Sequence, residues 1–501
     1  MSFRASFVIL IVGFLVFISN PATAQNLNFD NYSYGWQIQG VTSTAGDTPF
    51  WLHSNRQGEM YRYSANGTLS LFASGSHTFD SGLSLSGKAN LFFRGADEST
   101  IRFQQIYGKV SYRPFQLSVG RKQQDFGFVH PQLTMGSVEM SHNTRPMTQL
   151  NFSTVDFQPV PFTDHILYYD ASLAHGWKDD TEFRYARDVL VHQKHLYLRI
   201  FSDDAPVSPR AGIVHFAHWG GDFSHLGDDA PVEDGRQVSL GAYRDVFFSL
   251  ASDSREIIEG GGLPNRHQNH FGSYDFGLVF NQGPYRLELS RQFILEDTPN
   301  ARFGTPWDGL WGVTLELRDD TETRWRDDGS ESGSPSSDFR PALQAIHYEH
   351  INTLDGLTRY EHRDRERHVN YYNHSTYRGG WTYEGRSIGN PLFIGEQGYI
   401  GVVNNQLVGH HLGLMGHTGP VDWRFFTTYS RNYGAGRVAR QDDGARVNKL
   451  TDREDQWSFM LELQTETLLP NLETSAALAY DSGDLYSENL GLLLSIRWNS
   501  N

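Results

Sequence analysis

The sequence predicts an all-β fold, a transmembrane antiparallel β-barrel of the bacterial outer membrane with about 16 to 18 strands. Three observations lead to this prediction. The chain begins with an export signal, apolar and polar residues alternate along many later segments, and aromatic residues, which gather at the two membrane interfaces of such barrels, make up 14% of the chain. With no cysteine in the chain, disulfide bonds and thiolate metal sites are excluded.

Residues 1–24 are predicted to be a secretory signal peptide. One positive charge precedes an apolar run at residues 7–18, and an Ala-x-Ala cleavage site follows. The run is shorter than the roughly twenty residues that a permanent membrane-spanning helix needs. The barrel is therefore expected to occupy residues 25–501, where spans of about ten residues plus their connections fit the expected strand number.

The first clear hairpin is predicted in residues 68–95. Leucine, alanine and phenylalanine alternate there with serine, lysine and asparagine on both sides of Asp80-Ser81-Gly82, a tight turn in which the glycine is free to adopt a positive φ. Just before it, the segment YSYGWQIQGV at residues 32–41 also predicts a strand. The same alternation recurs in segments 106–119, 285–293, 421–429 and 457–466.

The last segment, ENLGLLLSIRWNSN, shows which architecture these strands favour. One face of it is apolar, with Leu490, Leu492, Leu494, Ile496 and Trp498. In a sandwich such faces meet each other, whereas in an outer-membrane barrel they meet lipid and the polar faces line the lumen. Short turns alternating with long polar stretches favour the barrel, and the terminal aromatic residue fits a last strand that the barrel assembly machinery recognises.

Three longer connections are predicted. Residues 318–339 and 440–456 are polar, without an apolar period, and are expected to be extracellular loops. Residues 202–235 combine apolar residues with proline and glycine, which predicts either a loop insertion or a segment folded into the lumen as a plug.

Charge and residue usage narrow the partners. The net charge of -16 disfavours nucleic acid. The basic residues are nearly all arginine, because lysine occurs only at Lys88, Lys109, Lys122, Lys178, Lys194 and Lys449. Arginine binds carboxylate and phosphate groups through two parallel hydrogen bonds, so an interior that handles polyanions and a simple compositional preference both remain open.

An enzymatic role is not expected. The histidine pairs His215/His218, His192/His195 and His410/His411 lack the third ligand and the carboxylate spacing of a metal site. Neither a His-Glu-x-x-His nor a Gly-x-Ser-x-Gly motif is present. No metal and no cofactor is predicted.

Short blocks of the sequence resemble Wzi-type capsule assembly proteins. Residues 119–150, with the element Ser-His-Asn-Thr-Arg-Pro, are similar to that family's best-preserved block. Residues 46–60 and the HWGG at 218–221 are similar to its variants in Bacteroidetes-type bacteria. Proteobacterial members carry an N-terminal helical bundle, whereas residues 25–65 of this chain include the predicted strand at 32–41.

The resemblance implies a barrel of about eighteen strands that binds capsular or other surface polysaccharide, assists capsule assembly or retention at the cell surface, and carries out no catalysis. It places candidate binding residues at Arg121, Asn143 and Arg145 in the matching block and at Trp219 in the Gly-rich segment. Arginine suits acidic sugars, although each of these residues could equally serve structure alone. The alternative function is an outer-membrane porin or substrate-specific channel, which differs by requiring an open lumen.

Overall fold

The structure is a computed structural model that describes residues 30–179, 186–230, 238–249, 268–296, 303–317, 342–355, 370–442, 444–469 and 471–500. It is a closed antiparallel β-barrel of eighteen strands, in agreement with the prediction. The sheet contains twenty strands, of which β7 (Gln158–Pro159) and β17 (Tyr399–Ile400) are two-residue additions. The first and last strands pair with each other and close the barrel.

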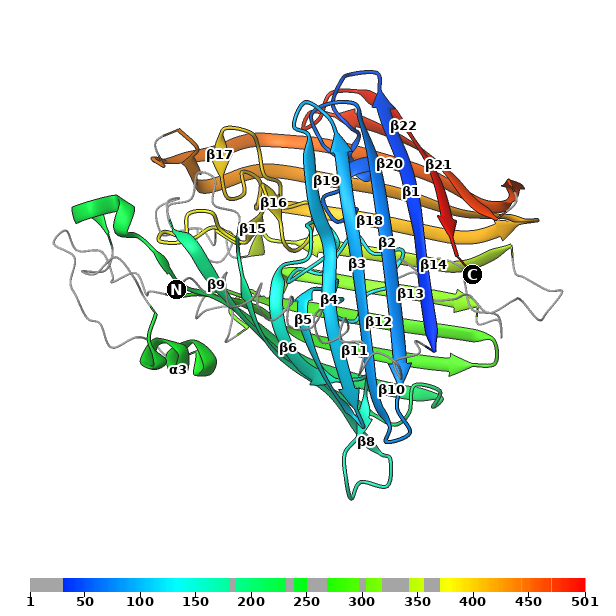
Figure 1. The fold of residues 1–501 in the computed structure, drawn as a ribbon. Helices are drawn as coiled ribbons and strands as arrows, with labels where there is room; N and C mark the ends of the chain where they lie inside the picture. Colours follow the sequence, from blue (N-terminus) through cyan, green and yellow to red (C-terminus); the bar gives the residue numbers. More distant parts are fainter. Residues whose placement is uncertain are drawn as a thin grey trace, which may run out of the picture.

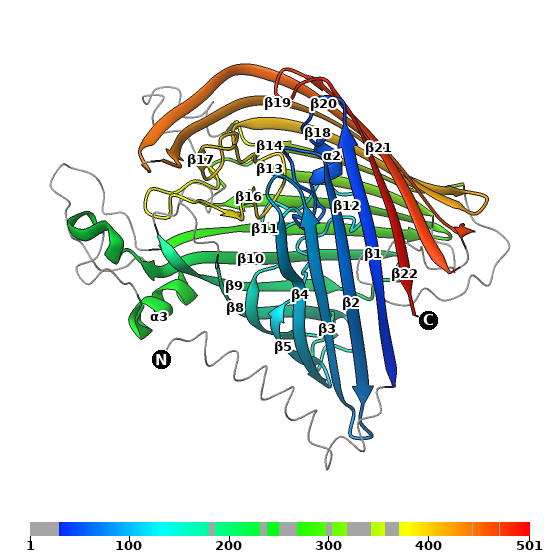
Figure 2. The ribbon, with the colours of Figure 1, turned by 45° about the horizontal axis from the view of Figure 1, so that its top comes forward.

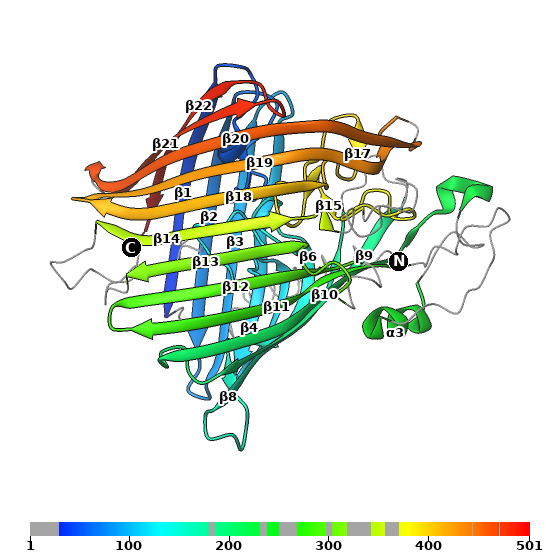
Figure 3. The ribbon, with the colours of Figure 1, turned by 180° about the vertical axis from the view of Figure 1, so that it is seen from behind.

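Figures 1 and 3 show the barrel strands from two sides. The first nine are β1 (Asn31–Ser43), β2 (Asn66–Thr78), β3 (Leu83–Gly95), β4 (Thr100–Tyr112), β5 (Phe115–Arg121), β6 (Thr148–Thr154), β8 (Leu167–Trp177), β9 (Arg187–Ile200) and β10 (Val207–Asp222). The other nine are β11 (Gln268–Gln282), β12 (Tyr285–Leu295), β13 (Gly309–Leu317), β14 (Leu343–Asn352), β18 (Leu407–Thr418), β19 (Val421–Arg440), β20 (Arg446–Leu469), β21 (Leu472–Gly483) and β22 (Asn489–Asn499). The short elements are α2 (Phe50–His53), the 3₁₀ helix η2 (Ser224–Asp229), α3 (Leu240–Phe248), β15 (Thr382–Tyr383) and β16 (Arg386–Ser387).

The strands predicted from alternation are all present. The hairpin in 68–95 is formed by β2 and β3, which pair from Gly67 with Gly95 to Thr78 with Ser84. Gly82 in its turn has a φ of 80°, a conformation that favours glycine. The segment at 32–41 lies in β1.

The two ends of the barrel differ in their connections. At the turn end, tight turns join β2 to β3, β4 to β5, β11 to β12 and β18 to β19. The N-terminal end of β1 and the C-terminal end of β22 lie at this end too. At the loop end, longer connections join β1 to β2, β5 to β6, β10 to β11 and β14 to β18. In outer-membrane barrels the short turns are periplasmic and the long loops extracellular.

The last strand shows how the wall faces lipid. Leu490, Leu492, Leu494 and Ile496 of β22 are exposed on its outer face, while Leu493 between them is fully buried inside the barrel. The apolar face predicted for this segment is therefore the outward face, which lipid covers. Among the described helices, none is long and apolar enough to cross a membrane.

The lumen is filled by a plug made of two connections. Residues 122–147, between β5 and β6, and residues 370–406, between β14 and β18, pack together and against the inner wall. Their buried side chains include Leu133, Met135, Val138, Tyr371, Tyr372, Trp381, Ile388 and Phe393. In Figure 2 the part with β16 and β17, in yellow, lies beneath the arch of β18–β20.

A plug was thus predicted correctly in kind but wrongly in place. Residues 202–235, the predicted insertion, are instead mostly the wall strand β10, followed by η2, and residues 231–235 lie outside the described part. Phe216 of β10 packs inward against Trp381 of the plug, and Trp219 packs outward beneath α3. Because the part of β10 near the loop end is covered on both faces, its sequence does not alternate there.

The segment 440–456 is also different from the predicted loop. β19 continues to Arg440 and β20 starts at Arg446, so these residues form a paired hairpin that extends the wall at the loop end. A strand that extends beyond lipid has water on its outer face and needs no apolar period, which explains why its sequence looked like a loop.

Two other predictions fall on residues outside the described ranges. The predicted signal peptide at 1–24 is one of them. The extracellular loop predicted at 318–339 is the other.

Candidate functional site

A polar cavity of about 600 Å³ lies at the loop end, between the β1–β2 connection, the β3–β4 turn and the plug. We call it the arginine–tyrosine cavity after the residues that line it. Its arginines are Arg62, Arg94, Arg102, Arg145 and Arg386, and its tyrosines are Tyr61, Tyr63, Tyr383, Tyr399 and Tyr486. The acidic residues of its lining are Glu98, Asp179, Glu384 and Glu396. Cations thus outnumber anions here in a chain with a net charge of -16.

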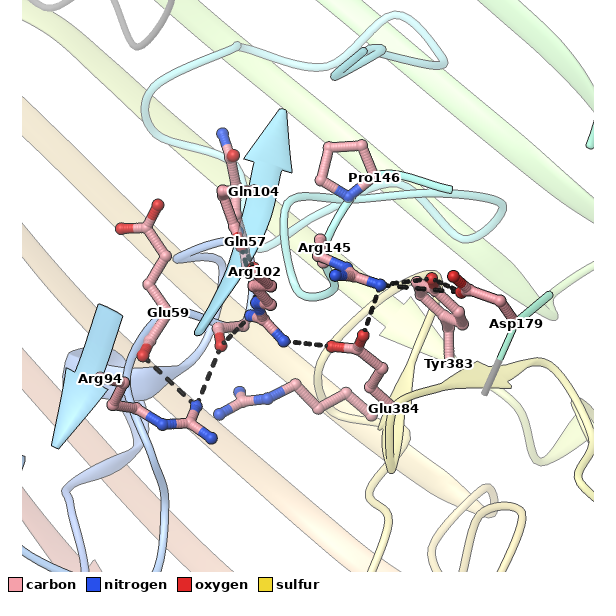
Figure 4. A network of polar contacts seen from close by, with 12 residues as sticks. Gln57, Glu59, Arg94, Arg102, Gln104, Arg145, Pro146, Asp179, Tyr383 and Glu384 are labelled. Carbon is pink, nitrogen blue, oxygen red and sulfur yellow. Dashed lines mark hydrogen bonds and ion pairs between the residues drawn. The ribbon is translucent and has the colours of Figure 1, made fainter. Parts of the chain in front are cut away.

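One side of the cavity is an internally paired network, shown in Figure 4. Arg145 forms an ion pair with Glu384 at 2.9 Å and donates a hydrogen bond to the hydroxyl of Tyr383 at 3.0 Å. Arg102 binds the other carboxylate oxygen of Glu384. These contacts hold the β15–β16 hairpin of the plug against the wall strand β4.

Asp179 belongs to the same network. Burial alone would raise the pKa of its carboxyl group, but the charges of Arg121 and Arg145 and a hydrogen bond from Tyr383 outweigh burial and lower that pKa. Asp179 is therefore ionised at neutral pH and neutralises the guanidinium groups beside it.

The other side of the cavity has a surplus of positive charge. Arg62 donates to the carbonyl of Gly395, and Arg386 donates to the carbonyls of His53 and Met60. Neither guanidinium forms an ion pair with a carboxylate in the described part of the chain.

Arg386 shows the consequence of this surplus. Its pKa is lowered to about 10, first by burial and then by the positive charges of Arg94, Arg62 and Arg102. A guanidinium with this pKa is still charged at neutral pH, so the repulsion between the arginines persists. An anion bound among them would relieve that repulsion.

Aromatic rings accompany the arginines. The guanidinium of Arg62 lies 5.2 Å from the ring centroids of both Tyr63 and Tyr486, and that of Arg94 lies 5.1 Å from the ring of Tyr61. Such rings offer an apolar platform with a polar tip, next to donors that fit carboxylate or phosphate. The combination suits a ligand that has both acidic groups and flat apolar faces.

The structure brings three of the four predicted site residues together. Asn143 and Arg145 line the cavity, and Asn143 donates to the carbonyl and hydroxyl of Ser387 at 3.1 and 3.0 Å. Arg121 is outside the cavity lining but contacts two of its residues. It donates a hydrogen bond to the hydroxyl of Tyr383 at 2.8 Å and forms an ion pair with Asp179.

Trp219, the fourth predicted residue, lies elsewhere. Its indole is on the outer face of β10, packed against Ala217 and Val246 beneath α3. It lines none of the cavities described here.

Most residues that line the arginine–tyrosine cavity were not predicted from the sequence. Arg62, Arg94, Arg102 and Arg386 come from separate connections and strands, and no local motif links them. The one signal that could have pointed to them is the excess of arginine over lysine. The β15–β16 hairpin, which carries Tyr383 and Glu384, has no alternation of apolar and polar residues. No sequence pattern therefore predicted that it lies beside Arg145.

A second cavity, of about 260 Å³, lies in the lumen on the other side of the plug. Its lining is rich in amides, with Gln37, Gln39, Asn90, Gln105 and Gln464, and contains Arg424 and Glu462. Arg424 binds Glu462, and the lining as a whole contains as many acidic as basic residues. Plug residues line both cavities, so the plug lies between them.

No group of three or more metal-ligating side chains in the described ranges is arranged to hold a metal ion. His215 and His270 approach each other, with Nε2 and Nδ1 2.9 Å apart, on the outer face of the wall.

Comparison with solved structures places the barrel beside Wzi of Escherichia coli, an outer membrane protein involved in group 1 capsule assembly and described as a carbohydrate-binding β-barrel. The TM-score is 0.53 at 15% identity, over 95% of this chain and 86% of Wzi. OccK5 of Pseudomonas aeruginosa follows with a TM-score of 0.43 at 10% identity, over 94% of this chain and 98% of OccK5. OprD of the same organism also has a TM-score of 0.43, at 9% identity over 94% and 93% of the two chains.

The similarity to Wzi supports the outer-membrane barrel fold, and the identity of 15% is too low to carry a function. No protein-family model matches the chain. No curated protein sequence matches it either.

Proposed function

We propose that this outer-membrane barrel binds capsular or other surface polysaccharide of acidic character in the arginine–tyrosine cavity, and thereby assists capsule assembly or retention at the cell surface. The observation that carries the proposal is the presence of Arg62 and Arg386, which form no ion pair with a carboxylate of the described residues, in a cavity lined by tyrosine rings. Uronic acid units would supply the carboxylates that such arginines bind and the sugar faces that rest on aromatic rings.

The location of the cavity supports this proposal. Its walls come from connections at the loop end, which is the extracellular end in barrels of this kind. A polymer attached to or surrounding the cell would reach this end without crossing the membrane. The proposed role is binding alone, without catalysis.

A porin or substrate-specific channel is the alternative function. Such a protein needs a continuous open lumen with a charged constriction. The buried plug residues Leu133, Trp381 and Phe393 count against this alternative, because they occupy the space that a channel would require.

Assembly of the barrel is part of the proposal. The outward residues of β22 and its terminal Trp498 are proposed to contact outer-membrane lipid and to be recognised by the barrel assembly machinery.

The first experiment measures binding of oligoglucuronate, a uronic acid oligomer, to the purified barrel by titration calorimetry, and records conductance in planar bilayers on the same preparation. We expect saturable binding, weaker at high salt, with little conductance. The double variant Arg62→Gln/Arg386→Gln should weaken binding by at least about tenfold, since a hydrogen bond to a charged group contributes about 1.5–3 kcal/mol.

Two matched controls distinguish binding in the cavity from a general effect of the protein's charge. Arg453→Gln removes one positive charge from an exposed position on β20, where Arg453 pairs with Asp455, and should bind like the unmodified protein. The carboxyl-reduced, neutral form of the same oligomer should bind much more weakly. Steady conductance without binding, or equal loss of binding in Arg453→Gln, would contradict the proposal.

A further inference from the structure

A short helix of the β10–β11 connection is packed on the outside of the barrel wall. Figure 3 shows α3 next to the loop-end ends of β9 and β10. Tyr243 of the helix packs on Trp219 of β10, with 5.7 Å between the ring centroids, and Phe247 packs on His192 of β9 at 5.7 Å. Val246 is fully buried in the same contact. One face of α3 is thus fixed to the wall.

Polar contacts hold the helix in the same place. The amide of Gln268 on β11 donates to the carbonyl of Ala242 at 3.3 Å, and Lys194 on β9 donates to the carbonyl of Phe247. The hydroxyl of Ser249, just after the helix, lies 3.0 Å from Nε2 of His215. At the C-terminal end of α3, Lys194 thus binds the carbonyl of Phe247, and the backbone N–H of Ser249 donates to the carbonyl of Val246 at 3.2 Å. Free carbonyls and the helix dipole favour a cation at this end.

The opposite face of α3 is exposed and apolar at both ends. Leu240 is 89% exposed and Phe248 63% exposed, although both are large apolar residues. Arg244 lies between them on the same face, because residues four apart share one side of a helix, and its guanidinium forms an ion pair with Asp245 at 2.7 Å. An exposed apolar face with a central arginine is typical of helices that lie in the interface of a membrane, where the arginine reaches the headgroups.

The position of α3 along the wall identifies what covers this face. On the outer surface of β9, β10 and β11, the exposed apolar residues Leu196, Ile213 and Phe276 are the last ones before the loop end. On the same outer surface, the next residues toward the loop end are Lys194 of β9 and His215 of β10. Lys194 contacts α3, and His215 contacts Ser249 just after the helix. The helix therefore starts where the lipid-facing belt stops.

We infer that α3 lies on the outer leaflet of the membrane as an interfacial helix, with Leu240 and Phe248 inserted among lipid chains and Arg244 at the level of the headgroup phosphates. This surface continues the lipid-facing belt and is separate from the arginine–tyrosine cavity. It also gives Trp219 a structural role, as the base on which the helix rests.

Spin labelling tests this directly, because the chain has no cysteine of its own. Nitroxide labels at Leu240→Cys and Phe248→Cys are examined in proteoliposomes of phosphatidylethanolamine and phosphatidylglycerol. Their collision rates with oxygen, which concentrates in lipid, and with a water-soluble nickel chelate are compared. A label at Leu196→Cys, on the wall belt, serves as the lipid reference, and one at the exposed Asp442→Cys serves as the aqueous reference.

We expect the labels at 240 and 248 to have oxygen-to-nickel ratios shifted toward that of position 196. Ratios equal to that of position 442 would place the helix in water and overturn the inference. Shielding from both reagents would mean that protein covers this face, and would overturn it as well. Since every substituted side chain is on the surface, correct folding is checked separately by heat-modifiable migration on gels.

Discussion

Glu349, on the inner face of β14, joins the barrel wall to the plug through one carboxylate. Its two oxygens accept hydrogen bonds from the hydroxyl of Thr134 at 2.6 Å and from the backbone N–H of Met135 at 2.7 Å. The side chain is fully buried. Because water cannot replace these bonds, the plug depends on this residue more than its single position in the sequence indicates.

Glu349→Ala should lower the free energy of unfolding by about 3 kcal/mol, since it leaves the buried N–H of Met135 and the part-buried hydroxyl of Thr134 without their acceptor. Tryptophan fluorescence during guanidinium unfolding in lipid vesicles measures the change. Asp442→Asn, which removes a carboxylate from the exposed pair with Arg440, is the control and should change stability by less than about 0.5 kcal/mol. Equal effects of the two variants would refute the anchoring role.

At the cavity, sequence reasoning reached Asn143 and Arg145 through a local block and missed Arg62 and Arg386. The first two are two residues apart, so a short motif can carry both. The other two lie more than 300 residues apart in the sequence and meet only because the β1–β2 connection and the plug enter the same end of the barrel. The resemblance also predicted Trp219, whose position on the outer wall could not be read from residue type.

The plug is an irregular element buried without strand pairing along most of its length, so its backbone needs other partners. Asparagine side chains supply many of them. Asn390 donates to the carbonyl of Gly136 at 2.6 Å, Asn405 to that of Tyr371 at 2.7 Å, and Asn404 to that of Leu392 at 3.2 Å. Side-chain amides stabilise the plug, and its sequence has no apolar period. The alternation of apolar and polar residues, which predicted the strands, therefore did not predict the plug.

Gly389 lies where the two plug segments are in close contact. A methyl group there would collide with the hydroxyl of Tyr372 and the carbonyl of Val138, which are hydrogen-bonded to each other. Gly389→Ala should therefore separate the segments, lower the free energy of unfolding by about 1–3 kcal/mol and raise conductance in planar bilayers.

Gly436→Ala is the matched control for this substitution, because the added methyl would meet no heavy atom within 4 Å. It should leave stability and conductance unchanged. Conductance that stays at the unmodified level in Gly389→Ala would show that the plug closes the lumen without this contact.

The whole molecule is a wall closed by β1 and β22, with lipid outside and a packed plug inside. Leu494 is at the middle of β22 on the outer face, where it is 53% exposed and pairs with Gly40 of β1. Closure leaves the membrane-spanning sheet without a free edge, and every outward position at mid-height must then be apolar.

Leu494→Arg should lower the free energy of unfolding in vesicles by about 2–4 kcal/mol, the cost of a cation at the bilayer midplane. Tyr32→Arg, at the turn end of β1, should cost only about 0–1 kcal/mol because its position is at the interface. Guanidinium titration of both variants measures the difference. Equal costs would mean that depth in the membrane does not govern the outer face.

The sequence by itself determined the class of this protein, because the two-residue period of a strand is a local property that each segment carries independently of its partners. It therefore predicted the hairpin in 68–95 and the lipid-facing leucines of the last strand. Tertiary structure alone decided where the plug lies, which arginines share a cavity and which side of β10 carries Trp219. Those features depend on contacts between distant segments, and a strand covered on both faces, or a loop buried through its amides, leaves no period in the sequence to read.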